Sequence, residues 1–145
     1  MNTKSKRYLV PAVFVVVVGL AGGQMFVKGQ SQSGAGKLAV VWTSGDSEVA
    51  HKVCFMYTHN AKKAKWFDEV VLIVWGPSSR ILAGDNKLQA AVKQMIKDGV
   101  VVQACVVCAD MYGVAGRLRE MGIEVKGMGR PLSNMLKDDY KVITF

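Results

Sequence analysis

The feature that most constrains the fold is an alternation of strand-like and helix-like segments between Lys37 and Phe145. Short runs rich in β-branched residues predict strands, and apolar residues at helical spacing lie between these runs. The predicted strands are residues 37–44, 69–75, 100–104, 123–128 and 140–145. Strands that alternate with helices predict a mostly parallel sheet covered by helices on both faces. We therefore expect an α/β fold: a single three-layer domain with a mostly parallel five-stranded sheet.

The segments between the strands differ in the strength of their helical pattern. After a capping residue at Asp46 or Ser47, the first predicted helix places one apolar face inward. That face consists of Ala50, Val53, Cys54, Tyr57, Ala61 and Ala64. The stretch "GPSSRILAGD" (76–85) is predicted to be a loop, and a helix over 86–99 follows it. A helical segment reaches Met121 with a break near Gly113, and a short helix covers 130–139 with Pro131 in its first turn.

Charge does not indicate nucleic-acid binding. The net charge of +8 divides evenly, because residues 1–36 carry four bases and no acid, and residues 37–145 carry 15 bases and 11 acids. A basic stripe interleaved with aromatic residues, the usual sign of a nucleic-acid interface, is missing from the sequence. We expect no nucleic-acid partner.

The first 27 residues resemble an export signal or a membrane anchor. A short basic stretch precedes the apolar run Leu9–Val27, which is barely long enough to span a bilayer as a helix. Basic residues before the run favour a cytoplasmic N-terminus, with the domain on the extracytoplasmic (periplasmic) side. The sequence leaves open whether the segment is cleaved. Residues 28–36, rich in Gly, Ser and Gln, are predicted to be a linker, and residues 37–145 the domain.

Two of the three cysteines, Cys105 and Cys108, follow the third predicted strand. In parallel sheets, ligands bind beyond the carboxyl ends of the strands. The loops predicted at 43–47, 76–85 and 105–110 should meet at this edge. The cysteine pair therefore lies where this fold usually carries its chemistry.

Four interpretations of the pair compete. A zinc site usually needs four ligands, and the third cysteine, Cys54, is expected in the core, so we expect no metal. A thioredoxin site is disfavoured because its C-x-x-C motif follows an early strand and opens a long helix, whereas the pair here follows the third predicted strand. A nucleophilic thiolate is favoured for Cys105, because a helix N-terminus lowers the pKa of a cysteine. Two packed thiols without chemistry remain the alternative.

The stretch "QACVVCADMYGV" resembles the DsrE/DsrF-like family of sulfur-relay proteins, as do the opening "LAVVWTSGD" and the end "GIEVKGMGRPLSNMLKDDYKVITF". The resemblance implies a compact α/β domain, assembled as a trimer or hexamer. It also implies a persulfide on the cysteine after the strand, which is Cys105 here. Cys108 would be a resolving thiol. No cofactor is expected, and the sulfur donor and acceptor proteins are not indicated.

Three functions follow as hypotheses. The first is a sulfur carrier or sulfurtransferase that uses Cys105 and Cys108. The second is a membrane-tethered thiol–disulfide protein, because an extracytoplasmic compartment favours oxidation of such a pair. The third is a non-catalytic oligomeric binding module.

Overall fold

The computed structural model describes residues 36–145. The elements follow in the order β1 (Lys37–Trp42), α1 (Ser47–Val49), a π-helical stretch η1 (Ala50–Phe55), α2 (Met56–Lys63), β2 (Glu69–Val74), α3 (Pro77–Gly84), α4 (Asn86–Lys97), β3 (Val101–Cys105), α5 (Val106–Met111), α6 (Ala115–Glu120), β4 (Glu124–Lys126), α7 (Gly129–Lys137) and β5 (Tyr140–Thr144).

The strands of the described residues form one sheet in the order β4-β3-β2-β1-β5, and every neighbouring pair is parallel. The predicted three-layer α/β domain is therefore confirmed, and the sheet is parallel throughout. The predicted hydrophobic segment at 1–27 and the linker at 28–36 lie outside the described residues, apart from Gly36.

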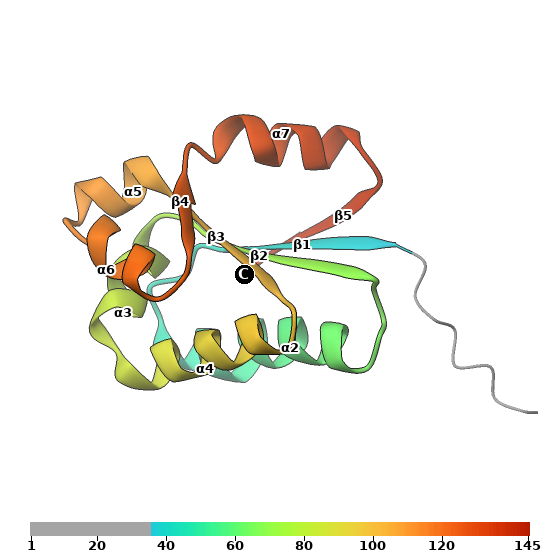
Figure 1. Ribbon diagram of the computed structural model, residues 1–145, viewed down its shortest axis with the longest axis horizontal. Helices are drawn as coiled ribbons and strands as arrows, with labels where there is room; N and C mark the ends of the chain where they lie inside the picture. Colours follow the sequence, from blue (N-terminus) through green and yellow to red (C-terminus); the bar gives the residue numbers. More distant parts are fainter. Residues whose placement is uncertain (1–35) are drawn as a thin grey trace, which may run out of the picture. The chain divides into compact units, whose positions relative to one another are not determined.

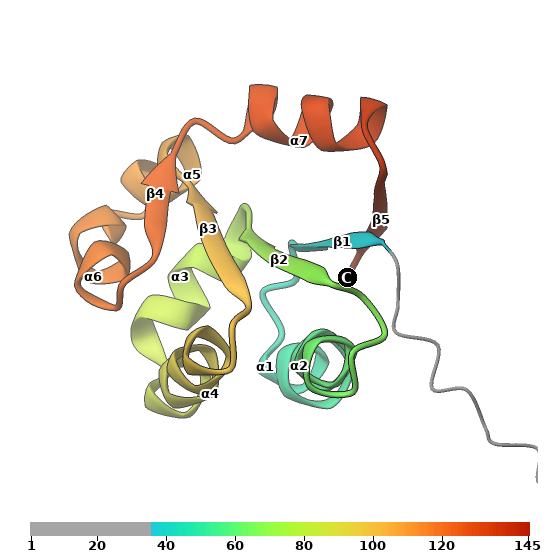
Figure 2. The same cartoon turned by 45° about the vertical axis from the view of Figure 1, so that its right-hand side comes forward.

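The direction of the chain across the sheet reverses once. From β1 to β4 each new strand is added on the same side of the last, and the chain then returns through α7 to place β5 beside β1. Because crossovers between parallel strands are right-handed, a reversal of direction puts the connecting helix on the opposite face. Figures 1 and 2 show this arrangement, with α7 on one face of the sheet and α2 and α4 on the other.

Each face of the sheet has its own core. Along β2, the side chains of Val70, Leu72 and Val74 belong to the large core beneath α2, α3, α4 and α6. Val71 and Ile73 point the other way, into a smaller core that contains Cys105 and that α7 covers. Burial on both faces explains why "EVVLIV" is a continuous apolar run, as is typical of parallel sheets.

The buried face of the first helix differs from the prediction. Val53 is 42% exposed and Ala64 is also exposed, whereas Phe55 and Thr58 are buried. The cause is η1, whose π-helical turns bond residue i to i+5 and rotate the later side chains relative to an α-helix. Ala50 and Phe55, five residues apart, therefore both face the core.

The prediction of a loop over 76–85 is wrong, because most of this stretch is the helix α3. Its first residue is Pro77, whose fixed φ suits the first turn of a helix. Leu82 and Ala83 are buried in the large core. Gly76, Pro77, Ser78 and Ser79 are residue types that favour turns, but only Gly76 lies outside the helix.

The remaining elements agree with the sequence. The predicted break near Gly113 is confirmed, since α5 and α6 are separated there and Gly113 has a φ of 66°. The helix predicted over 86–99 is α4, in which Leu88, Val92 and Met95 are buried. Within residues 36–145, no helix combines the length and apolar character needed to cross a bilayer.

Candidate functional site

Cys105 lies at the junction that the sequence predicted. It is the last residue of β3 and stands directly before α5. Its side chain points into the smaller core and is 6% exposed. The neighbouring edge strand brings Lys126 opposite Cys105 in the sheet register, but the Lys126 ammonium is 2.8 Å from the Glu124 carboxylate. The lysine is thus already paired.

Cys108 is the more accessible of the two cysteines. It follows one helical turn after Cys105, is partly exposed and packs against the same small core. Its pKa is raised, first by burial and then by a hydrogen bond with Cys105. Both residues are free thiols in the described structure. The structure therefore brings the two cysteines together at the same small core.

Gly76 follows the end of the neighbouring strand. Burial and Cys105 raise the pKa of the Cys108 thiol, and the backbone of Gly76 opposes this rise. The sequence analysis did not identify Gly76 as part of the site. The only signal was its place directly beyond a buried strand, at the edge of the sheet that holds the cysteines.

The loops at this edge do meet, as predicted. Ser78 Oγ donates a hydrogen bond of 2.6 Å to the Trp42 carbonyl, which joins the start of α3 to the end of β1. A Cβ placed on Gly45 would lie 3.2 Å from Pro77 Cβ, so the loop after β1 lies against the same turn. The segment after β1 and the start of α3 thus lie together at this edge of the sheet.

Within the described structure, the start of α5 makes no direct bond to the Cys105 side chain, and the expected stabilisation of its thiolate stays a prediction. We expected free N–H groups at the start of the following helix to stabilise its thiolate. In the described part of the chain, however, the Cys105 side chain makes no capping hydrogen bond to α5. The reason is its direction, because the thiol turns into the small core beside Cys108.

The third cysteine is not part of the site. Cys54 is fully buried in the large core, on the other face of the sheet, as predicted. Burial raises the pKa of its thiol to about 12. Across residues 36–145, no three His, Cys, Asp or Glu side chains gather as a metal ion would need.

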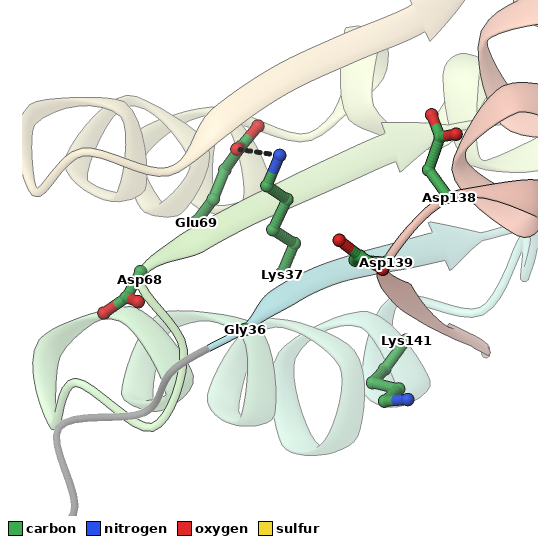
Figure 3. Close-up of a pocket in the computed structure, with 7 residues that line it drawn as sticks. All are labelled: Gly36, Lys37, Asp68, Glu69, Asp138, Asp139 and Lys141. Atoms are coloured by element: carbon green, nitrogen blue, oxygen red, sulfur yellow. Dashed lines mark ion pairs between the residues drawn. The ribbon is translucent and has the colours of Figure 1, made fainter.

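A hollow of about 900 Å³ lies at the opposite, amino edge of the sheet. Figure 3 shows that Lys37 and Glu69 point toward each other there, whereas Lys141 projects away from them. The Tyr140 hydroxyl also donates a hydrogen bond to the Glu69 carboxylate. Burial is the larger cause, and this carboxylate the smaller one, that raises the pKa of Tyr140 to about 12. The charged groups that line the hollow are thus partly paired with one another. The hollow lies at the edge of the sheet opposite the cysteines.

Comparisons with known proteins agree with this geometry. The DsrE/DsrF-like family matches residues 36–145. A solved structure of a conserved protein of unknown function from Bacteroides thetaiotaomicron is 31% identical, has a TM-score of 0.74, and aligns over 79% of this chain and 98% of its own. No functionally curated protein matches the chain significantly. The family match covers well over half of the sequence, so this chain belongs to the DsrE/DsrF-like family.

Proposed function

We propose that the chain is a sulfur-handling protein in which Cys105 carries sulfane sulfur as a persulfide and Cys108 is the resolving thiol. The family is linked to sulfur relay in general. The observation that carries the proposal is the packing of both cysteines against one small core at the carboxyl edge of the sheet. The near-complete burial of Cys105 supports its role, because burial shields a persulfide from water and from other thiols.

The exchange between the two cysteines balances without a further reactant. The Cys108 thiolate attacks the inner sulfur of the Cys105 persulfide, a disulfide forms between them, and HS⁻ leaves. If the thiolate attacks the outer sulfur instead, that sulfur moves to Cys108 and Cys105 leaves as a thiolate. Both steps need Cys108 deprotonated and within reach of Cys105. A donor would meet the pair from the side of Cys108, which is the more exposed thiol.

A reversible thiol–disulfide function is the second candidate. The same pair supports it, because two cysteines that are three residues apart and pack against one small core are candidates for a disulfide. An extracytoplasmic compartment would favour the oxidised form. In this function the pair exchanges electrons with a partner and carries no extra sulfur.

Mass spectrometry of the purified full-length chain separates these functions. After incubation with a sulfane-sulfur donor, the sulfur carrier gains the mass of one sulfur, and this gain is lost in Cys105→Ser. A thiol–disulfide protein instead loses two hydrogens on oxidation. Two thiols that do neither would contradict both functions and favour a non-catalytic binding module.

The order of reactivity tests the roles of the cysteines. We expect Cys105→Ser to lose the fast-reacting thiol in alkylation measured against pH, and Cys54→Ser to react like the parent. If Cys105→Ser keeps the fast thiol while Cys108→Ser loses it, the two roles are reversed. If none of the variants differs from a free-cysteine rate, the site is structural.

We also propose that Leu9–Val27 directs the chain to a membrane, with the domain on the extracytoplasmic side, and that the domain forms a homotrimer or homohexamer. Exposed large apolar side chains such as Met111 (80% exposed) support self-association, because contact with another copy would cover them. Full-length protein found in the soluble cytoplasm would contradict the first part. A monomer in sedimentation at high concentration would contradict the second.

A further inference from the structure

We propose that Lys126 belongs to an anion-binding site beside Cys105, where its ammonium pairs with anionic sulfur. The sulfur is either the outer atom of a persulfide on Cys105 or the charged end of a free donor. A persulfide is a stronger acid than a thiol, so its outer sulfur is negatively charged near neutral pH. This inference rests on the proposed function, because it assigns a charge partner to the sulfur that Cys105 would carry.

Two residues of β3 and two of β4 share one face of the sheet. The register pairs Gln103 with Glu124 and Cys105 with Lys126. Cys105 faces the small core, and because side chains alternate along a strand, Gln103, two residues earlier, faces the same side. Paired residues of neighbouring strands also point the same way, and such strands lie about 4.8 Å apart. The sheet therefore places a cation, Lys126, directly beside Cys105.

Hydrogen bonds tie the charged pair on β4 to β3. Gln103 Nε2 and Lys126 Nζ each donate to Glu124 Oε2, both at 2.8 Å. Gln103 is 8% exposed in a strand of otherwise apolar residues, and its Oε1 is buried without a partner among the described residues. A buried acceptor without a partner costs stability, so core packing does not explain this amide. Its bond to Glu124 does.

This arrangement allows Lys126 to change its partner. An ammonium has three N–H donors, and in the part of the chain that the structure describes Lys126 uses one of them, toward Glu124. Because Gln103 donates to the same carboxylate oxygen, Glu124 keeps a partner when the ammonium turns to a sulfur anion. The Lys126 side chain is 36% exposed, which leaves it room to turn. Glu124 thus holds the lysine in place until an anion arrives.

Alkylation by two reagents of similar size tests the site in the full-length chain. With Cys54→Ser and Cys108→Ser in place, Cys105 is the remaining one of the three cysteines. Iodoacetate is an anion and iodoacetamide is neutral, so the ratio of their rates reports a cation beside the thiol. Lys126→Met should lower this ratio about two- to fivefold, as expected for one partly exposed charge interaction, and Lys126→Arg should keep it. Lys141→Met, on the edge strand at the other side of the sheet, is the matched control and should leave the ratio unchanged.

Two results would overturn the proposal. One is an equal ratio in Lys126→Met and Lys141→Met. The other is a folded chain in which neither reagent reaches Cys105, because the site must admit a small anion. Glu124→Gln should raise the ratio, since it removes the charge that competes for the ammonium, and an unchanged ratio would contradict the exchange of partners.

A second measurement distinguishes the two sources of anionic sulfur. In nuclear magnetic resonance spectra of the same full-length variant, the side-chain signals of Lys126 are followed while the Cys105 thiol loses its proton, with Cys105→Ser as the blank. Signals that follow this titration assign the site to sulfur attached to Cys105, and constant signals assign it to the charged end of a free donor. Neither measurement requires a persulfide, so a failure of the sulfur-carrier function, seen by mass spectrometry, is distinguishable from a failure of this site.

Discussion

Cys54 should make the domain sensitive to alkali. Its thiol is fully buried in the large core, and burial raises its pKa from 9.0 to about 12. Above pH 9 the unfolded chain releases this proton while the folded chain keeps it. Because the folded state then binds more protons than the unfolded state, the free energy of unfolding falls as pH rises. The loss continues until the pH reaches the folded pKa.

The size of the effect follows from the two pKa values. Each pH unit between them removes about 1.4 kcal/mol from the free energy of unfolding. Two units above the unfolded pKa, Cys54 alone should therefore cost the domain about 2.7 kcal/mol. That is a large part of the 5–15 kcal/mol or so that stabilises a typical domain.

Urea unfolding followed by circular dichroism at a series of alkaline pH values measures this loss. Cys54→Ala should be less stable than the parent near neutral pH, because it leaves a small cavity, but its stability should fall less steeply above pH 9. The raised pKa values of Cys108 and Tyr140 remain in both proteins, so the difference between the two slopes isolates Cys54. Parallel slopes would refute the reasoning.

Three further predictions concern stability. His59 Nε2 lies 2.5 Å from Asp98 Oδ2, and this contact is the main cause that lowers the pKa of Asp98. It stabilises the fold above pH 3.8, and this stabilisation is lost as the pH falls through the lowered pKa. The free energy of unfolding of Asp98→Asn should therefore fall less in acid than that of the parent, and identical acid unfolding curves would contradict the prediction. Asp85 accepts hydrogen bonds from the first turn of α4, so Asp85→Ala should lower the free energy of unfolding by about 1 kcal/mol, measured in urea; an unchanged midpoint would argue against the cap. Leu72→Ala should cost about 3 kcal/mol because Leu72 is fully buried, whereas Leu136→Ala, at a side chain 62% exposed, should cost little; similar losses in thermal unfolding would show that burial is not the cause.

The sheet could be predicted from the sequence because its strands are unambiguous. The run from Glu69 to Val74 is buried on both faces, and such a run has few alternatives to a central parallel strand. The order of the strands could not be predicted residue by residue, because it depends on pairings between segments far apart in the chain. Helix α3 was missed because its first residues, Gly76 to Ser79, have turn-forming character, and only packing against the core shows that a helix follows.

The site was predictable only in part, for a similar reason. The end of β3 fixes Cys105 at the carboxyl edge of the sheet, and the spacing of the motif places Cys108 beside it. The spacing of residues could not show that, in the described structure, the Cys105 thiol turns into the small core and makes no bond to the start of α5. The π-helical stretch is a comparable case, since Val53 fits an α-helical face until the register shifts.

The position of β5 beside β1 has a consequence for synthesis of the chain. Thr43 Oγ1 bonds the Phe145 carbonyl across 102 residues of sequence, and β1 gains its second neighbour only through this late strand. A ribosome produces β1 first, so the sheet stays incomplete until residues 140–145 have been made. Such distant pairing slows folding and delays it beyond most of translation. If the first residues direct the chain to a membrane, as proposed, a domain that folds this late would still be unfolded when it is moved across.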